Sequence, residues 1–310
     1  MLQKITFFII TILCCWVSSA QKSKVHQLSI TTDNDAYLGK LKDGYYSSGF
    51  FIHYRFANTA KQPNVLRELT LTHKIFTPQG RVFYLRNGID RPFCGLLSLA
   101  YSQRKFVKQN TMHQCEANVA TIGKNALGEN VQQYIHRVMG FRQYGGWENQ
   151  LQNELGINGR YTIAKQIFSS KKKQWYQVVP MVEATVGNTF TYAKVGTFIS
   201  VGWMNKLNNG ALFNAQMLST EANANKKFEL FFSFQPQITA YAYNATVQGG
   251  LFTNDANANN IHRLVYQQNW QIVYAQQRFT AKLGVSYLTP EGTLQQRPQR
   301  FGTISIGYQF

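Results

Sequence analysis

The chain has 310 residues, and its 32 lysines and arginines against 14 acidic residues give a formal net charge of +18 at neutral pH. Charged residues make up only 15% of the chain and aromatic residues 14%. A disordered protein would be poor in aromatic residues, and neither a collagen-like protein nor a coiled coil has this composition, so these three classes are excluded. The length would ordinarily suggest two domains, but one β-barrel can accommodate it.

The first twenty residues have the pattern of a secretory signal peptide. Lys4 supplies a positive charge, residues 5–17 form an apolar run, and small residues lead up to Ala20. A membrane anchor is the weaker alternative, because the apolar run is too short to span a bilayer as a helix. We therefore predict a signal peptide over 1–20 that is cleaved after Ala20, and a single mature domain over 21–310.

Two cysteines remain in the predicted mature chain, Cys94 and Cys115. One disulfide is too few to hold together a fold of this size, although a single bond is possible in an oxidising compartment. Their pairing stays open at this stage, and their spacing matches no metal-binding motif.

Beyond the signal, apolar and polar residues alternate over segments that Gly, Asn, Asp and Lys clusters separate. In the last segment Ile304, Ile306, Tyr308 and Phe310 share one face, and small or polar residues take the other. The pattern predicts twelve strands, near residues 25–35, 46–57, 66–76, 95–106, 112–123, 158–168, 175–187, 192–204, 228–242, 264–274, 278–288 and 300–310.

Two all-β folds are compatible with this alternation. A soluble sandwich would bury the apolar faces, whereas a membrane barrel would turn them to lipid around a polar lumen. The signal peptide, the length of the strands and the aromatic C-terminal residue favour the barrel. An even strand number with both termini on one side is typical of outer-membrane barrels. We therefore predict a twelve-stranded antiparallel transmembrane β-barrel in the Gram-negative outer membrane, with its N-terminus in the periplasm.

Connection lengths indicate which end of the barrel is elaborated. The connections after odd-numbered strands include four long ones, at residues 36–45, 77–94, 124–157 and 243–263. Long loops on one side are typical of the extracellular end of such barrels. The long connection 205–227 lies on the opposite side and does not fit this asymmetry. Residues 129–139 follow a helical pattern that places Gln132 and His136 on one face. A helix is not needed to close a barrel, so an insert within 128–155 over the mouth is a candidate functional element.

Several familiar catalytic motifs are absent from the sequence. It contains no G-x-S-x-G elbow, no H-E-x-x-H, no Walker loop and no pair of C-x-x-C motifs. Lysines and arginines are scattered over strands and loops, which argues against nucleic acid as the partner. For a secreted barrel we expect the anionic partner to be lipid phosphate or lipopolysaccharide at the membrane surface.

Polar residues gather where strands meet the long connections. The segments are T-T-D-N-D at 31–35, D-G-Y-Y-S-S-G at 43–49, D-R-P-F-C-G at 90–95, V-Q-Q-Y-I-H at 131–136 and G-W-E-N-Q at 146–150. Strict alternation puts Ser47 on the same face as Phe51 and His53, which predicts that its hydroxyl points into the lumen.

This set of segments resembles the outer-membrane lipid A 3′-O-deacylase family. The family pattern has an N-D pair, D-x-x-Y-T-x-G, D-R-P-x-x-G, V-Q-x-x-x-H, a glycine four residues after that histidine, and G-W-x-x-Q. The matches lie in the same order over residues 33–150, with Ser47 in place of the threonine and Gly140 after the histidine. The rest of the chain is similar only in strand pattern.

The resemblance implies a calcium-dependent carboxylic ester hydrolase that removes the 3′-linked acyl chain of lipid A at the outer membrane, as a monomer. It implies Ca²⁺ binding by Asp35 and Ser47, which offer the oxygen ligands that this ion prefers. His136 would take a proton from the attacking water, and Asn34 would stabilise the oxyanion together with the ion. Gln132, one helical turn away, would orient His136 or hold the water.

Two positions depart from the family pattern. Family members carry a lysine in the second long loop, where this chain has Arg81 and Arg86, and the two residue types are not interchangeable at a precise site. A glutamate six residues after the histidine is replaced by Arg142. Two alternatives to the hydrolase therefore stay open. One is a catalytically silent barrel of the same family that binds lipopolysaccharide, and the other is a passive pore, which the clustered motif residues disfavour.

Overall fold

The computed structural model describes residues 24–39, 44–79, 89–141, 143, 145–169, 175–218 and 228–310. Twelve long strands make up most of these residues: β1 (Lys24–Asn34), β2 (Tyr45–Asn58), β3 (Val65–Thr77), β4 (Cys94–Val107), β5 (Thr111–Ile122), β6 (Glu154–Lys165), β8 (Tyr176–Gly187), β9 (Phe190–Trp203), β10 (Phe228–Asn244), β11 (Leu264–Gln276), β12 (Phe279–Leu288) and β13 (Gln299–Gln309). A two-residue strand, β7 (Phe168–Ser169), pairs with β8. The predicted signal peptide lies outside the described residues.

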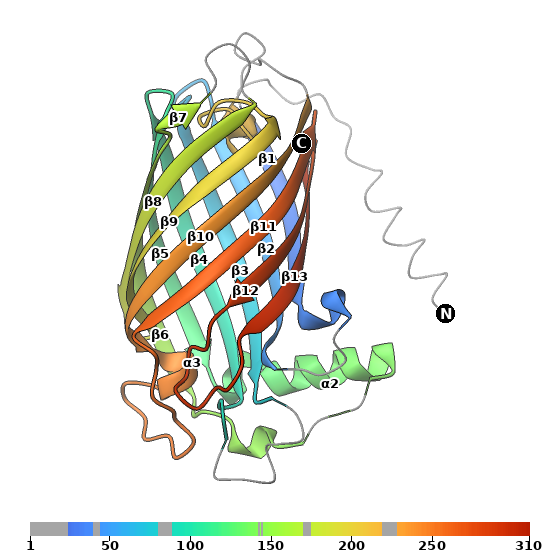
Figure 1. Ribbon diagram of the computed structural model, residues 1–310, viewed down its shortest axis with the longest axis vertical. Coiled ribbons are helices and arrows are strands. Elements are labelled where there is room, and N and C mark those ends of the chain that lie inside the picture. The colour runs from blue at the N-terminus through green and yellow to red at the C-terminus, as the bar shows by residue number, and fades with distance from the viewer. Residues whose placement is uncertain are drawn as a thin grey trace.

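The strands form one closed antiparallel barrel (Figure 1). Each long strand pairs with its neighbours along the chain, β1 pairs with β13, and the β6–β8 pairing completes the circle. The predicted twelve-stranded barrel is confirmed, and a two-sheet sandwich is excluded. The sixth strand was predicted over 158–168 but covers Glu154–Lys165. No helix in the described part of the chain is long and apolar enough to cross a membrane.

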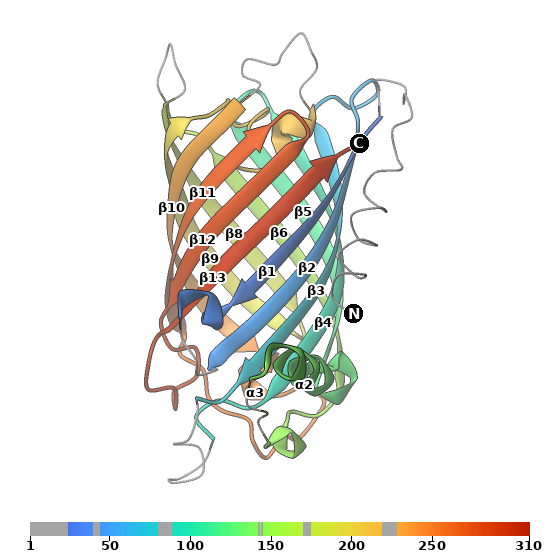
Figure 2. The same ribbon diagram turned by 90° about the vertical axis from the view of Figure 1, so that its right-hand side faces the viewer.

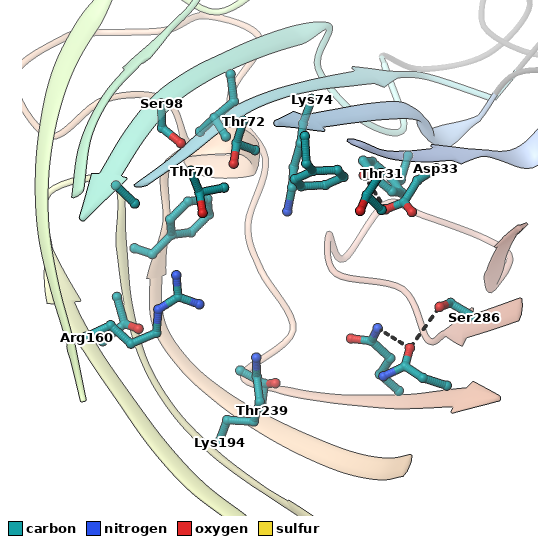
Figure 3. A pocket seen from close by; sticks show the side chains of 18 of the residues that line it. Thr31, Asp33, Thr70, Thr72, Lys74, Ser98, Arg160, Lys194, Thr239 and Ser286 are labelled. Atoms are coloured by element: carbon teal, nitrogen blue, oxygen red, sulfur yellow. Dashed lines mark hydrogen bonds between the residues drawn. The ribbon is translucent and has the colours of Figure 1, made fainter. Parts of the chain in front are cut away.

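Side chains alternate between the lumen and the outer face, as the period-two pattern predicts. On β3, Thr70 and Thr72 line a lumen cavity of about 670 Å³, while Leu69 and Leu71 face outward and are 39% and 41% exposed. Figure 3 shows the polar side chains of several strands, among them Lys74, pointing into this cavity. The barrel thus has a polar interior and an apolar exterior, the arrangement of a barrel set in lipid.

The charged residues of the lumen are largely arranged as ion pairs. The pairs are Arg55 with Glu68, Arg104 with Glu68, Arg160 with Glu116, and Lys194 with Glu183. The Lys194 Nζ atom lies 3.0 Å from a Glu183 oxygen that also accepts from the Tyr192 hydroxyl at 2.8 Å. Charges removed from bulk water need such partners, because an unpaired buried charge is strongly destabilising.

A buried segment fills the end of the lumen at which β1 begins and β13 ends, here called the termini end. Residues 204–218, which include the short helix η5 (Ala215–Leu218), pack into a cluster with side chains of the surrounding strands. Figure 2 shows the gold coil of η5 inside this end of the barrel. The Glu229 carboxylate holds the segment by accepting backbone N–H groups of Asn205 at 3.0 Å and Ala211 at 3.1 Å. This plug accounts for the described part of connection 205–227, which the loop asymmetry left unexplained.

The opposite end, here called the loop end, carries the long connections and a second apolar layer. Tyr46, Phe76, Leu96 and Phe301 from four strands pack there with Ala245, the first residue of the short helix α3 (Ala245–Gln248). The polar cavity therefore lies between two apolar clusters. Such packing argues against a passive pore, which needs a water-filled path.

The two cysteines of the barrel do not form a disulfide. Both are free, Cys94 buried and Cys115 exposed. Cys115 pairs across the sheet with Gln103, nine residues along β4 from Cys94, so the two sulfur atoms belong to distant parts of the wall.

Candidate functional site

The N-D pair ends the first strand and begins a short helix on the outer face of the barrel. The Asn34 Oδ1 atom accepts a hydrogen bond of 2.7 Å from the Ala36 N–H and caps η1 (Asp35–Leu38). The helix lies against β13, where a Cβ atom on Gly302 would come within 2.8 Å of Tyr37. Gly302 alternates with the lumen-facing Phe301 and Thr303, so η1 covers the outer side of the wall.

Two neighbouring carboxylates therefore face different environments. Asp33 points into the lumen, where it accepts hydrogen bonds from Tyr46 at 2.9 Å and Thr303 at 2.8 Å. Asp35 is 2% exposed and accepts the Gly44 N–H at 3.3 Å. Because Asn34 pairs with Ser48 in the β1–β2 register, Asp35 comes next to Ser47 at the end of the ladder.

Ser47 lies in a β-bulge, and this corrects the predicted direction of its side chain. Tyr46 opposes Phe76 and Ser48 opposes Ile75, so Ser47 is the extra residue between the two pairs. Its hydroxyl lies 2.5 Å from the Thr77 hydroxyl, and Thr77 shares the outer face of β3 with Ile75. The prediction that Ser47 points into the lumen was wrong, since a bulge shifts the phase of the strand by one residue.

The predicted helix is α2 (Gly128–Met139), which ends at Gly140 in a left-handed conformation with φ of 73°. Its buried residues are Gly128, Gln132 and His136, which are spaced four apart and so lie on one face. Gln132 is 4% exposed and His136 is 7% exposed. The helix thus turns a stripe of polar side chains toward the protein, here called the polar stripe and consisting of Gln132 and His136.

The helix packs against the outer face of β3 and β4 rather than across the mouth of the lumen. A Cβ atom on Gly128 would lie 2.9 Å from the Gly95 Cα atom, so only glycine permits this approach. The His73 Nε2 atom is 2.8 Å from the Ala126 carbonyl oxygen, and Val131 packs on Ile75 and its neighbours. In Figure 1, α2 projects sideways at the loop end, and in Figure 2 it points toward the viewer. The helix was predicted correctly, but its expected position over the mouth was not.

Trp147 fixes the middle of this helix. The indole lies 1% exposed in η4 (Trp147–Asn149) and packs on Phe93 with ring centroids 5.0 Å apart. Its Nε1–H donates a hydrogen bond of 2.7 Å to Gln132 Oε1. One turn further on, the His136 ring meets Phe141 edge to face at 5.8 Å. The G-W-x-x-Q segment therefore orients the polar stripe, a role that sequence reasoning did not assign to Trp147.

The D-R-P segment is structural. Arg91 is fully buried, pairs with Glu291 at 2.9 Å and lies 4.3 Å from the centre of the Phe76 ring. Asp90 accepts the Tyr45 hydroxyl at 2.8 Å, and burial raises the pKa of the Asp90 carboxyl above its ordinary value. These contacts join the second long connection to the barrel end.

The five predicted site residues form two groups at the loop end, on neighbouring parts of the outer wall. Asn34, Asp35 and Ser47 make up the first group through the β1–β2 register and the bulge. Gln132 and His136 make up the second. Both groups adjoin β3, since Thr77 contacts Ser47 and the same strand packs against α2. That all five meet around one substrate remains a prediction, and Arg81, Arg86 and Arg142 lie outside the described residues.

The first group has the donor chemistry of a site for a hard cation. It offers one buried carboxylate on Asp35 and two hydroxyls, on Ser47 and Thr77, which are oxygen ligands of the kind that Ca²⁺ prefers. Within the described ranges no cluster of three or more His, Cys, Asp or Glu side chains could hold a metal ion.

An antiparallel barrel of this size, with an apolar outer wall and a polar group of side chains outside that wall, defines an outer-membrane protein. The sequence matches the model of the family described as outer membrane protein LpxR over residues 6–310, and the chain belongs to this family.

Among solved structures, LpxR from Salmonella typhimurium is similar to this chain, with a TM-score of 0.77 and 18% sequence identity over 91% of this chain and 99% of that chain. The KdgM porin in complex with disordered oligogalacturonate has a TM-score of 0.41 and 5% identity over 92% of this chain and 99% of that chain. No curated protein matches the sequence.

Proposed function

We propose that this protein is a lipid A deacylase that hydrolyses the ester of the 3′-linked acyl chain. The observation that carries the proposal is the polar stripe, which is buried between a loop helix and the outer face of an outer-membrane barrel. A soluble substrate would be expected to enter a lumen or a cleft, whereas this position adjoins the leaflet in which lipid A lies. Family membership supports the same chemistry.

His136 is the proposed general base. A neutral imidazole can take a proton from water as the water attacks an ester carbonyl, provided that the ring is held in place. The ring lies on the buried face of α2 against Phe141, and the same helix is fixed one turn earlier by the Trp147–Gln132 hydrogen bond. Gln132 is therefore a positioning residue in this scheme, and a serine nucleophile is not needed.

Asn34 is the proposed oxyanion donor. Its Oδ1 atom accepts the Ala36 N–H as the cap of η1, so the donors in this role would be the two hydrogens of Nδ2. A preorganised amide donor aimed at the developing negative charge contributes about 2.7–4 kcal/mol in acyl-transfer enzymes. The cap would hold the amide in one orientation for this role.

Asp35 and Ser47 would hold a calcium ion, with the Thr77 hydroxyl beside them. A bound Ca²⁺ would supply positive charge at the ester carbonyl oxygen. The buried position of Asp35 at the N-terminus of η1 keeps its carboxylate in one place, and removal of that charge would leave the remaining neutral oxygens a poor site for a divalent cation.

A silent lipopolysaccharide-binding barrel is the second candidate, and the specific observation in its favour is Arg142 in place of the family's glutamate. The deciding experiment is digestion of lipopolysaccharide by the purified protein in detergent, with Ca²⁺ or with chelator, followed by mass spectrometry of lipid A. Loss of the 3′ acyl mass only with Ca²⁺ supports the hydrolase. An unchanged lipid A from protein that is folded and retains lipopolysaccharide would favour the silent binder.

A further inference from the structure

The helix α2 has three distinct faces. At about 100° of rotation per residue, the polar stripe takes one side of the helix. Glu129, Gln133 and Arg137 follow on one flank, and the Gln133 amide donates to Glu129 at 3.0 Å. The other flank carries apolar residues. We call Leu127, Tyr134 and Val138 the apolar flank, including Leu127 as the N-cap residue.

The apolar flank is open to the surroundings although its side chains are large. Leu127, Tyr134 and Val138 are 52%, 66% and 64% exposed. Met139, the last residue of the helix, and Phe141 beyond it add further exposed apolar side chains at this end of α2, at 61% and 40% exposed. The helix buries a glutamine and a histidine and exposes its apolar residues. Such an exposed apolar surface indicates an apolar partner outside the chain.

The position of the helix identifies that partner. The helix packs on β3 and β4, whose outward side chains include Leu71 and Leu99, 41% and 55% exposed. In an outer-membrane barrel these residues face lipid, so the apolar flank continues a surface that already contacts acyl chains. An amphipathic helix with basic residues beside an apolar face is the type that lies in the membrane interface. Lys124 and Arg137 are both exposed and supply that charge.

We propose that α2 is an interfacial helix whose apolar flank is inserted among the acyl chains of the outer leaflet. The flank with Glu129, Gln133 and Arg137, here called the charged flank, then faces the headgroups, and the polar stripe lies between the helix and the barrel wall beside the leaflet. An acyl chain of a leaflet lipid could approach the polar stripe sideways, without first leaving the bilayer. This placement needs only the outer-membrane barrel and does not depend on the hydrolase activity.

Spin-label accessibility tests the placement directly. The predicted mature chain over 21–310, carrying Cys115→Ser so that the exposed thiol is absent, is labelled at Tyr134→Cys or Val138→Cys and reconstituted into vesicles of phosphatidylethanolamine and phosphatidylglycerol. We expect both labels to relax faster with oxygen, which concentrates in the bilayer, than with a water-soluble nickel chelate. The matched control is Arg137→Cys on the charged flank of the same helix, for which the order should be reversed.

Two results would overturn the proposal. In one, the labels at positions 134 and 138 respond to the nickel chelate as strongly as the label at 137, which would place the apolar flank in water. In the other, the label at 134 shows spin–spin coupling that disappears on dilution with unlabelled protein, which would mean that a second copy of the chain covers the flank. Neither readout involves turnover, so a catalytically silent protein would still decide the question.

Discussion

The indole Nε1 of Trp147 donates a 2.7 Å hydrogen bond to the side-chain oxygen of Gln132, and both side chains are buried. This contact joins two sequence segments, G-W-x-x-Q and V-Q-x-x-x-H, that are 15 residues apart at the bonded positions. It also holds the turn of α2 that precedes His136. The position of the proposed base therefore depends on a residue that would not itself touch the substrate.

Replacing Trp147 with phenylalanine tests this dependence. Trp147→Phe keeps a ring against Phe93 but removes the donor, and a buried acceptor left unsatisfied costs about 1–3 kcal/mol. We expect faster hydrogen exchange in 128–139 and a reduced kcat for deacylation with little change in KM. Trp203→Phe is the matched control, because that indole is 61% exposed on the outer wall. Unaltered exchange and kcat in Trp147→Phe would refute the positioning role.

His136 carries the proposed proton transfer. The His136→Ala protein should fold and insert normally and lose about 10²–10⁴-fold in deacylation rate, the usual contribution of a general base. Gln309→Ala, at the other end of the barrel, should change neither property. The measurement is lipid A mass spectrometry over time, with heat-modifiable mobility on gels as the test of folding. Full activity in His136→Ala would overturn the mechanism.

The architecture could be predicted from the sequence because a barrel imposes a strict period of two residues on every strand. The last strand shows why: Ile304, Ile306 and Tyr308 face outward and are 39%, 53% and 48% exposed, as their alternation predicts. The helix over 128–139 was also predictable, since its polar stripe recurs at four-residue spacing. Local periodicity determines the strands and the helix, and both spacings can be read directly from the sequence.

Features that depend on a break in the period or on tertiary packing escaped prediction. The bulge at Ser47 changes the phase of β2 without any mark in the sequence, so the hydroxyl was assigned to the wrong face. The plug of 204–218 has no periodic pattern, although Leu207, Leu212 and Met217 are a usable signal, because they are apolar residues in a connection where a short polar turn was expected. The role of Trp147 was not predicted, because its hydrogen-bond partner Gln132 lies on another element.

Asp35 should control the response to calcium. Asp35→Asn removes the charge while keeping the shape of the side chain, and a hard divalent cation binds neutral oxygens far more weakly. We expect deacylation to fall and to need much higher Ca²⁺ for partial recovery, measured as activity against free calcium. Asp33→Asn is the neighbouring control, because that side chain points into the lumen and should leave the calcium response unchanged. Identical calcium curves for the two variants would exclude Asp35 as the ligand.

The hydroxyl of Ser47 should matter more than the size of its side chain. Ser47→Ala leaves the Thr77 hydroxyl without the partner that lies 2.5 Å away, and loss of one buried hydrogen bond costs about 0.5–1.5 kcal/mol. We expect Ser47→Ala to lower both thermal stability and calcium affinity. Ser47→Thr, which restores the family residue, should retain activity and calcium affinity within a few-fold. A Ser47→Ala protein that binds calcium like the unaltered chain would limit the residue to packing.

The last prediction concerns the plug at the termini end. Reconstituted in planar bilayers, the unaltered protein should show no steady conductance, because residues 204–218 fill this end of the lumen with apolar side chains.

Glu229→Ala removes the carboxylate that accepts the N–H groups of Asn205 and Ala211, and hydrogen bonds to a charged group contribute about 1.5–3 kcal/mol. We expect intermittent channel openings and faster hydrogen exchange across the plug in this variant, with deacylation at the far end of the barrel unaffected. Glu116→Gln is the control, since that carboxylate pairs with Arg160 and accepts a hydrogen bond from Gln114 in the lumen wall, away from the plug. Steady conductance in the unaltered protein would show that the plug does not seal the lumen and would restore the pore as a candidate function.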